Sequence, residues 1–429
     1  MHVYDLRAGD FAAAVRTFDR RYAPSPELIA KVADILAAVR GDGDAALIEL
    51  TSRYDGCHLE PANFLVQPIE RLEARGRIVP NLLRALEASK QNVQEFARRS
   101  QRTSWSAQNI QGAEVGERFD PFNRVGIYVP AGSAPLVSSA IMTVAIASAI
   151  GVPEIAVMTP AGAHPALNPS LLTALDLAGA TEIYRLGGAQ AIAALAYGTS
   201  TIPQVDKIFG PGNAYVTEAK RQVFGFVGVD LLPGPSEIMV LADDSANPRW
   251  IAADLLAQAE HGAHSIICLV TSTAELVEKV RQEILGQSKQ LNRQKELTAV
   301  LEHNASAVIV GDWSQAVEVV NRFAPEHLII VTRDAESWAE KITTAGAIFL
   351  GGYSPVALGD FVAGPSHELP TGGAAKCFSG LTVDQFQRRT SIVRYTPEAL
   401  QASIPITNEF SAAEQLDGHG VSVQIRMLG

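Results

Sequence analysis

The pair Glu326 and His327, in the segment NRFAPEHLIIV, is the clearest candidate for acid/base chemistry in this sequence. A helical pattern ends just before the pair and a buried strand begins with it, so a carboxylate and an imidazole meet where the two elements join. General acid/base catalysis requires such a pair in a cleft. Local sequence alone is equally compatible with an exposed glutamate beside a structural histidine.

Gln258 and His261 form a second candidate pair, at the end of the helical segment WIAADLLAQAE. Gly262 can terminate this helix, and the spacing of the pair puts both side chains on one face, where they could bind a metal ion. The alternative interpretation is a histidine that interacts favourably with the dipole at the helix C-terminus.

Two further polar clusters occur late in the chain. Asp360 and His367 follow the apolar segment AGAIFLGG, a place where ligand-binding loops of open α/β sheets collect. Glu414 and His419 lie in AAEQLDGHG, which by itself is typical of a solvated helix end. Gly-rich turns after several β-rich segments could bind phosphate, but none of them reads GxGxxG, and each is equally compatible with a packing turn.

The elements that must position these residues change in type along the chain. The first ~120 residues have helical periodicity, with Ser25 as a helix cap and Glu27 in the first turn. From Arg124 onwards, short β-rich segments alternate with Ala-rich helices, which predicts parallel sheets in two α/β domains that divide near Pro233 to Asp243. After Gly380 the sequence predicts a helical tail that ends in a short strand.

Length and composition restrict the class of protein. The 429 residues are 47% hydrophobic and 19% charged, which excludes disordered, collagenous and coiled-coil proteins. The net charge of −11 makes nucleic acid and membrane surfaces poor partners.

The uncharged stretch between Arg124 and Glu154 is interrupted by prolines, so we expect a buried strand, loop and helix there instead of a membrane span. The 3 cysteines are widely spaced, and the N-terminus lacks an apolar signal segment, so we expect a cytoplasmic protein.

With these segments in order, the chain resembles the histidinol dehydrogenase family over nearly its whole length. The resemblance is carried by GIYVPAGSAPL, GGAQAIAALAYGT, VDKIFGPGNAYVTEAKRQV, GPSEIMVLAD, DLLAQAEHG, RFAPEHL, GDFVAGPSHELPT and AAEQLDGHGVSVQIR. It implies a zinc-containing homodimer, with one Zn²⁺ per subunit, that uses NAD twice to oxidise L-histidinol to L-histidine through the aldehyde. That reaction is the last step of histidine biosynthesis.

The resemblance also implies a domain arrangement with incomplete Rossmann-like domains, which explains the missing GxGxxG. We expect an N-terminal arm (1–27), a first α/β domain that carries the metal and catalytic residues (28–127 and 239–380), and a second α/β domain on the NAD side (128–238). A dimerisation tail (381–429) is expected to complete the active site of the partner subunit.

Residue roles carried over from the family are expectations of the same kind. The catalytic pair would be Glu326 and His327. Metal ligands would be Gln258, His261, Asp360 and His419, and the same four residues with Ser236, His327, His367 and Glu414 would contact the substrate. The NAD contacts would be Tyr128, Gln190 and Asn213.

These roles are chemically reasonable, and one segment departs from the family. A shell of Gln, Asp and His without thiolate suits zinc that also binds the nitrogen atoms of a substrate. His327 can act as the base in both oxidations, Glu326 can activate water for the aldehyde hydrate, and Glu414 can bind an ammonium group.

Ser366 and Glu368 flank His367, where the family more often has Asn and Val. The alternative substrate is another small alcohol such as a sulfonated diol, although the acidic pocket residues favour a cationic one. A scaffold protein without turnover would be expected to lose Glu326 or His327, and both are present.

Overall fold

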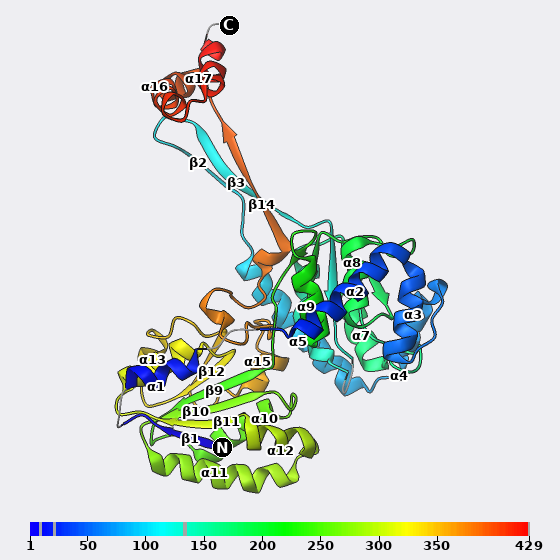
Figure 1. Ribbon diagram of the computed structural model, residues 1–429, viewed down its shortest axis with the longest axis vertical. Coiled ribbons are helices and arrows are strands. Elements are labelled where there is room, and N and C mark those ends of the chain that lie inside the picture. Colours follow the sequence, from blue (N-terminus) through cyan, green and yellow to red (C-terminus); the bar gives the residue numbers. More distant parts are fainter. Residues whose placement is uncertain (8–10, 20–22, 132–134, 428–429) are drawn as a thin grey trace. The chain divides into compact units, whose positions relative to one another are not determined.

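The computed structural model describes residues 1–7, 11–19, 23–131 and 135–427, which fall into two compact units (Figure 1). The first unit comprises Met1–Arg99 and Asn123–Val383, and the second comprises Ser100–Phe122 and Asp384–Gly429.

A six-stranded parallel sheet forms one half of the first unit. Its strands, in spatial order, are β1 (His2–Asp5), β11 (Ala305–Ile309), β10 (Ile266–Thr271), β9 (Glu237–Ala242), β12 (His327–Val331) and β13 (Ala347–Leu350). Both faces are buried, because Ile238 and Val240 of β9 pack in one apolar core while Met239 and Leu241 pack in another. Burial on both faces explains why these strands read as continuous apolar runs. The strand β1 at the edge was not predicted.

Helices cover the two faces of this sheet. The core that contains Ile238 also contains side chains of α10 (Pro248–Ala259), α11 (Ala274–Gln287) and α12 (Gln294–His303). The core that contains Met239 includes side chains of α1 (Phe11–Val15), η1 (Arg16–Phe18), α13 (Trp313–Phe323) and α14 (Ala335–Ala339).

A five-stranded parallel sheet forms the other half of the first unit. Its spatial order is β6 (Glu182–Tyr184), β5 (Glu154–Met158), β4 (Arg124–Tyr128), β7 (Lys207–Phe209) and β8 (Gly228–Val229). The helices between these strands are α6 (Val137–Ala149), α7 (Pro169–Ala178), α8 (Gly188–Tyr197) and α9 (Ala214–Val223). The predicted alternation of strands and helices is confirmed, and the chain passes from this sheet to the six-stranded sheet between Val229 and Glu237.

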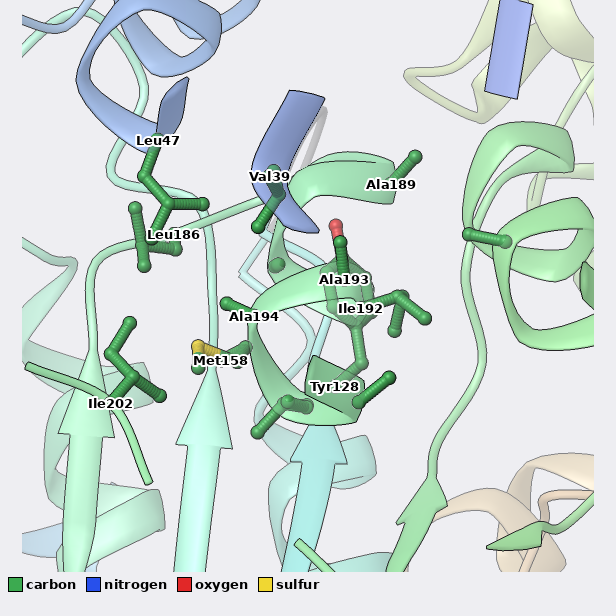
Figure 2. Close-up of a cluster of buried hydrophobic side chains, with 14 of the residues drawn as sticks. Val39, Leu47, Tyr128, Met158, Leu186, Ala189, Ile192, Ala193, Ala194 and Ile202 are labelled. Atoms are coloured by element: carbon green, nitrogen blue, oxygen red, sulfur yellow. The ribbon is translucent and has the colours of Figure 1, made fainter. Parts of the chain in front are cut away.

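Four helices between residues 26 and 100 precede the five-stranded sheet in the chain, and the first two of them share its apolar core. They are α2 (Pro26–Asp42), α3 (Asp44–Asp55), α4 (Pro68–Arg77) and α5 (Pro80–Ser100). Ser25 caps α2 as predicted, because its hydroxyl accepts a hydrogen bond from the Leu28 N–H at 3.2 Å. Figure 2 shows Val39 of α2 and Leu47 of α3 in the same core as Ala193 of α8. The expectation placed residues 28–127 with 239–380, the segment that forms most of the six-stranded sheet, whereas α2 and α3 contact the helix α8 of the five-stranded sheet. The small side chains of Ala-rich α8 allow the apolar faces of α2 and α3 to pack closely on it.

The second unit contains an antiparallel sheet followed by helices. Its elements are β2 (Trp105–Gln108), β3 (Glu114–Pro121), β14 (Gln387–Arg394), α16 (Pro397–Glu414) and α17 (Asp417–Gln424). The sequence prediction was wrong at two places: residues 105–108 and 114–121 are strands instead of helix, and the expected C-terminal strand is helix α17. A hydroxyl ties α17 to α16, because Ser411 accepts from the Gly420 N–H at 3.1 Å and donates to the Leu416 carbonyl at 2.6 Å. These hydrogen bonds between α16 and α17 favour a helix here, although the alternating pattern of VSVQI predicts a strand.

The strand and the helix in the uncharged stretch after Arg124 are buried, as predicted, while residues 132–134 lie outside the described residues. All five residues of β4 are buried, and most of α6 is buried as well. In the described ranges no helix combines the length and the apolarity that a membrane span requires.

Candidate active site

A pocket of about 1400 Å³ in the first unit is lined by residues from both parallel sheets. The five-stranded sheet contributes its carboxyl end, since Tyr128 is the last residue of β4 and Asn213 follows β7. The six-stranded sheet contributes its amino end, since Ser236 precedes β9 and His327 begins β12. Glu326 precedes β12 and also lines the pocket. Ligand loops are expected at the carboxyl ends of strands, so one sheet follows this rule and the other reverses it.

Glu326 and His327 lie side by side at the start of β12, as the sequence predicted. Helix α13 ends at Phe323, Ala324 adopts a left-handed backbone with φ of 53°, and the chain then enters the strand. Both side chains are buried, with 6% of Glu326 and 4% of His327 exposed. Glu326 Oε2 accepts a hydrogen bond from the Glu237 backbone N–H at 2.7 Å, which holds the carboxylate beside the imidazole.

The backbone of Glu237 also determines the tautomer of His327. Nδ1 lies 3.0 Å from the Glu237 carbonyl oxygen and 3.5 Å from Glu326 Oε2. Because a carbonyl oxygen only accepts hydrogen bonds, Nδ1 carries the ring proton and donates it. Nε2 is buried without a hydrogen-bond partner in the described part of the chain, and it lies 3.8 Å from Asp360 Oδ1. The neutral ring therefore presents a bare nitrogen, the form that a general base needs.

The pKa of His327 reflects two opposing influences. Burial disfavours the charged imidazolium, but the adjacent Glu326 carboxylate, followed by Asp360, outweighs it and raises the pKa to about 9. The carboxylates thus strengthen the affinity of this imidazole for a proton.

Three of the expected metal ligands belong to the first unit. Gln258 is on α10, and neither of its buried amide atoms has a hydrogen-bond partner among the described residues. His261 lies just beyond the end of α10 instead of on it, and its Nε2 is 4.0 Å from Asp360 Oδ2. Asp360 is on α15 (Val356–Phe361), a helix that contacts α10, so a helix rather than the predicted loop carries it. The unpartnered Gln258 amide, together with the His261 imidazole 4.0 Å from the Asp360 carboxylate, offers donor types that suit zinc.

Described His, Cys, Asp and Glu side chains do not form a group of three that could hold a metal ion. The remaining expected ligand, His419, is exposed on α17 of the second unit. Glu414, the last residue of α16, is also exposed and belongs to the same unit.

The expected NAD contacts line the half of the pocket that the five-stranded sheet forms. The Tyr128 hydroxyl accepts a hydrogen bond from the Gly188 N–H at 3.1 Å, and burial raises the pKa of Tyr128 to about 12. Gln190 is buried and donates to Asp55 Oδ2 at 3.4 Å. Asn213 caps α9, accepting from the Tyr215 N–H at 3.0 Å. The positive end of the α9 dipole and the Gly-rich turn before the helix make this half suitable for an anionic group.

A buried ion pair holds that Gly-rich turn in place. Lys220, which has no exposed surface, pairs with Asp230 and donates to the Gly210 carbonyl at 2.8 Å. Asp230 accepts from the Gly210 N–H at 2.7 Å. Gly210 has φ of 100°, and a Cβ there would lie 2.1 Å from the Tyr128 carbonyl oxygen, so only glycine fits. The turn is therefore rigid before any ligand binds.

Ser236 and His367 line the pocket as well, and His367 has a buried acidic neighbour. Its Nδ1 lies 3.4 Å from Glu368 Oε1, and burial lowers the pKa of His367. The Ser366 hydroxyl anchors this segment to α6, because it donates to the Met142 carbonyl at 2.9 Å and accepts from the Glu368 N–H at 3.2 Å. Glu368 also lines the pocket.

The sequence analysis missed Glu237 and Asp55. Glu237 contacts Glu326 and His327 only because β9 pairs with β12, which joins positions 89 and 90 residues apart. Asp55 is the last residue of α3, and burial raises its pKa beside Gln190. Glu237 lies in the segment GPSEIMVLAD, but nothing local in that segment shows that its backbone contacts residues 89 and 90 positions away, and no local signal marks Asp55.

Comparisons with known proteins agree with the resemblance seen in the sequence. A family model described as histidinol dehydrogenase matches residues 19–427. Histidinol dehydrogenase from Synechococcus sp. is 44% identical over 397 residues, covering 92% of each chain. The enzyme from Heliobacterium mobile is 42% identical, covering 92% of this chain and 93% of that one. The crystal structure of histidinol dehydrogenase from Elizabethkingia anophelis is 32% identical and superposes with a TM-score of 0.95, covering 100% of this chain and 98% of that one.

Proposed function

Because the chain belongs to the histidinol dehydrogenase family, we propose that it oxidises L-histidinol to L-histidine through the aldehyde, with NAD as oxidant, in the last step of histidine biosynthesis. The observation that carries this proposal is the His327 imidazole. Its Nδ1 is held by a backbone carbonyl, and its Nε2, which has no partner among the described residues, is buried in the pocket where it can exchange a proton with a substrate.

His327 serves as the base in both oxidations. In the first, Nε2 takes the proton of the substrate hydroxyl as hydride leaves the same carbon. In the second, the Glu326 carboxylate removes a proton from water, whose oxygen adds to the aldehyde while the protonated His327 returns its proton to the aldehyde oxygen, which forms the hydrate and restores the base. His327 then deprotonates this hydrate as the second hydride leaves. The Glu237 backbone keeps both side chains in position, because it bonds to each of them.

Zinc is the proposed metal, with Gln258, His261 and Asp360 of one chain and His419 as ligands. When bound, zinc supplies a Lewis acid that orients the substrate through its nitrogen atoms. The amide of Gln258 supports this assignment, because neither its oxygen nor its nitrogen has a partner among the described residues and a bound ion could satisfy the oxygen.

NAD is proposed to bind at Tyr128, Gln190 and Asn213, where it supplies the hydride acceptor for both steps. The preformed turn at Gly210 and the capped N-terminus of α9 support this placement.

The substrate is proposed to be a cationic amino alcohol. Four acidic residues of the pocket wall, Asp55, Glu260, Glu326 and Asp360, outnumber its Lys and Arg residues, Lys31 and Arg293, even without Glu368, whose raised pKa favours the neutral acid. Glu414 would add a carboxylate for the ammonium group, while Ser236 and His367 would supply hydrogen bonds. A sulfonated alcohol would meet like charge and is not favoured.

We propose a cytoplasmic homodimer in which the tail of one subunit completes the active site of the other. Mixed dimers of His261→Ala and His419→Ala chains test this sharing. If the ligands come from different subunits, subunit exchange creates one intact site and restores turnover. Verified heterodimers without any activity would exclude sharing but not zinc.

The direct test of the reaction supplies L-histidinol and NAD and measures reduced cofactor per substrate consumed. An alcohol that becomes an acid must release two hydrides, so a ratio of one would contradict the full reaction. Chelation should abolish turnover and zinc should restore it, and metal-free protein, verified by elemental analysis, that retained its rate would contradict the metal assignment.

Glu326→Gln separates the two oxidations. Single-turnover measurements should show early reduced cofactor without matching histidine, because the amide cannot activate water. Equal loss of both steps would contradict separate roles for Glu326 and His327.

A further inference from the structure

Lys220 and Asp230 form an ion pair that is enclosed in the interior of the first unit. Lys220 has no exposed surface, and 3% of the Asp230 side chain is exposed. An enclosed ion pair gains little stability over apolar residues of similar volume, because the cost of removing two charges from water offsets their attraction. The reason for this pair is therefore to be sought in the groups that it holds.

Both charged side chains bond to the backbone of one residue, Gly210. Lys220 on α9 donates to the Gly210 carbonyl at 2.8 Å, and Asp230 accepts from the Gly210 N–H at 2.7 Å. Asp230 follows β8, and its own N–H donates to the Ile208 carbonyl at 3.1 Å, which continues the pairing of β8 with β7. A helix and a neighbouring strand therefore both hold Gly210.

The residues directly after Gly210 belong to the pocket. Pro211, Gly212 and Asn213 line it, whereas neither Lys220 nor Asp230 is among the lining residues. The pair can therefore influence a ligand only through the turn. A turn that is already held in its binding conformation removes the cost of ordering it from the binding step.

We propose that Lys220 and Asp230 are positioning residues that hold the turn at residues 210–213 in the conformation that binds NAD, and so set the affinity for this cofactor without touching it. The contact of the turn with NAD rests on the proposed function. This role requires a turn that is ordered before NAD binds. It also requires that loss of the bond to Gly210 weakens the binding of NAD and not that of histidinol.

Hydrogen exchange of the Gly210 N–H, resolved to single amides by mass spectrometry with fragmentation, tests whether the turn is ordered in the free protein. The proposal expects slow exchange without NAD and little further protection when NAD is added. Fast exchange that becomes slow only with NAD would overturn it, because the turn would then form on binding. The measurement uses the wild-type protein, so it decides this point even if a variant does not fold.

Two substitutions of Asp230 test the hydrogen bond itself. Asp230→Ala and Asp230→Asn remove the same charge, but the amide oxygen of Asn can still accept from the Gly210 N–H. Calorimetry should show a Kd for NAD that rises about tenfold in the Ala variant, the loss expected for one hydrogen bond, and by less than about threefold in the Asn variant. The Kd for histidinol, measured with zinc-loaded protein, should stay unchanged in both.

Two results of these binding measurements would overturn the proposal. One is an equal Kd for NAD in the wild-type protein and both variants. The other is an Asn variant that binds NAD as weakly as the Ala variant, because the bond to Gly210 would then not be the cause.

Arg124→Met is the matched control, because it breaks another buried ion pair of the same sheet. Arg124 begins β4, at the opposite end of the sheet from the turn, and donates to Glu182 at 2.6 Å. Neither of these two residues is among those that line the pocket. The control should lower stability and leave the Kd for NAD unchanged. If it weakens NAD binding as Asp230→Ala does, the effect is a general response to a lost ion pair and the proposal fails.

The same measurements separate this role from the proposed reaction. A protein that binds NAD with the expected pattern but leaves histidinol unoxidised would contradict the reaction and support the positioning role. A wild-type protein that binds no NAD would overturn both.

Discussion

The amino ends of the two parallel sheets both carry charged residues, but they differ in how those residues are used. At the six-stranded sheet, buried polar atoms face a pocket without a partner in the described structure, whereas at the five-stranded sheet the charged side chains bond to each other's partners in one network. In the five-stranded sheet, the neighbouring strands β4, β5 and β6 begin at Arg124, Glu154 and Glu182. In the six-stranded sheet, the neighbouring strands β9 and β12 begin at Glu237 and His327. Equivalent positions in two similar sheets have therefore acquired different roles.

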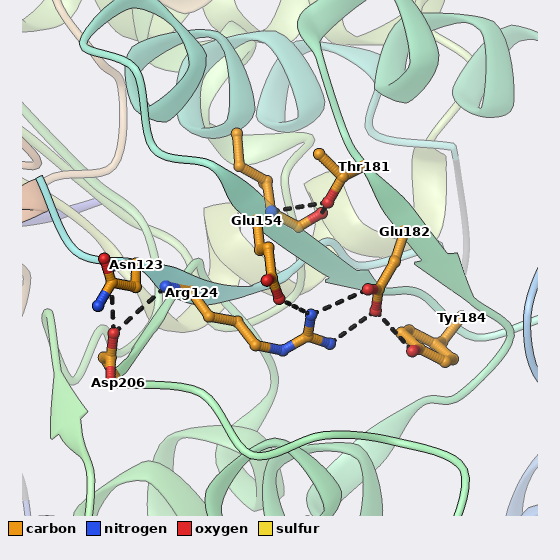
Figure 3. Close-up of polar contacts among 8 residues, drawn as sticks. Asn123, Arg124, Glu154, Thr181, Glu182, Tyr184 and Asp206 are labelled. Carbon is orange, nitrogen blue, oxygen red and sulfur yellow. Dashed lines mark hydrogen bonds and ion pairs between the residues drawn. The ribbon is translucent and has the colours of Figure 1, made fainter.

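At the edge of the five-stranded sheet, the Arg124 guanidinium forms hydrogen bonds to both Glu154 and Glu182 (Figure 3). Arg124 Nη1 donates to Glu154 at 2.6 Å and to Glu182 at 2.9 Å, and Nη2 donates to Glu182 at 2.6 Å. The Tyr184 hydroxyl donates to the same Glu182 carboxylate at 2.6 Å. Hydrogen bonding to Arg124 lowers the pKa of Glu182, and the same bond raises that of Arg124. This network closes the edge of the sheet, with only Arg124 Nε lacking a partner among the described residues.

The active-site edge is arranged differently. His327 Nε2 and His367 Nε2 remain unpartnered in the described structure although both are buried, and so does the amide of Gln258. Unsatisfied buried groups cost stability, so they persist where a ligand can satisfy them. We therefore expect substitutions at the Arg124 edge to alter stability and those at the pocket edge to alter activity.

The largest effect is expected for His327→Ala. Removing the base should reduce kcat for both oxidations by about 10²- to 10⁴-fold, because proton transfer from the hydroxyl loses its acceptor. Steady-state rates with histidinol and with the aldehyde measure the two steps. A variant with near wild-type turnover would show that another group is the base.

Arg124→Met should produce the largest loss of stability without a loss of binding. It leaves Glu182 without its cation, and the loss of a buried pair lowers the free energy of unfolding by about 3 kcal/mol. The lost pair with the half-exposed Glu154 should contribute less, because solvent screens it. Denaturant unfolding should report this loss while the KM for histidinol stays unchanged. A changed KM with unchanged stability would contradict the contrast between the two edges.

Glu368→Gln should change how stability depends on pH. Burial raises the folded-state pKa of Glu368 to about 8, above its ordinary value of 4.5. Between these values the group is ionised in the unfolded chain but protonated in the folded protein, so the free energy of unfolding falls as pH rises. The wild-type protein should lose stability relative to the Gln variant by about 1 kcal/mol per pH unit across this window. Thermal melts from pH 5 to pH 8 measure the difference, and parallel curves would mean that Glu368 is ionised throughout.

Glu154→Gln should have the smallest effect. Its side chain is 56% exposed, so its pair with Arg124 is screened by solvent and should contribute less than about 1 kcal/mol. Chemical denaturation beside Arg124→Met provides the comparison. A loss as large as that of Arg124→Met would show that Glu154, and not Glu182, is the main partner of the arginine.

Local sequence determined the elements and the residue types of the site. The alternation of apolar strands with Ala-rich helices predicted the parallel sheets, and Ser25 marked the start of α2. The segment around Glu326 and His327 predicted a carboxylate and an imidazole at a helix-to-strand junction, which is where they lie. Such features are visible in sequence because caps and periodicity involve residues a few positions apart.

Tertiary structure alone decided how those elements combine. The tautomer of His327 depends on Glu237, which strand pairing brings across 90 residues. The edge strand β1, the antiparallel strands β2 and β3, and the packing of α2 on α8 likewise depend on partners distant in sequence. Backbone hydrogen bonds between strands and the fit of apolar faces belong to pairs of segments, so neither segment specifies them by itself.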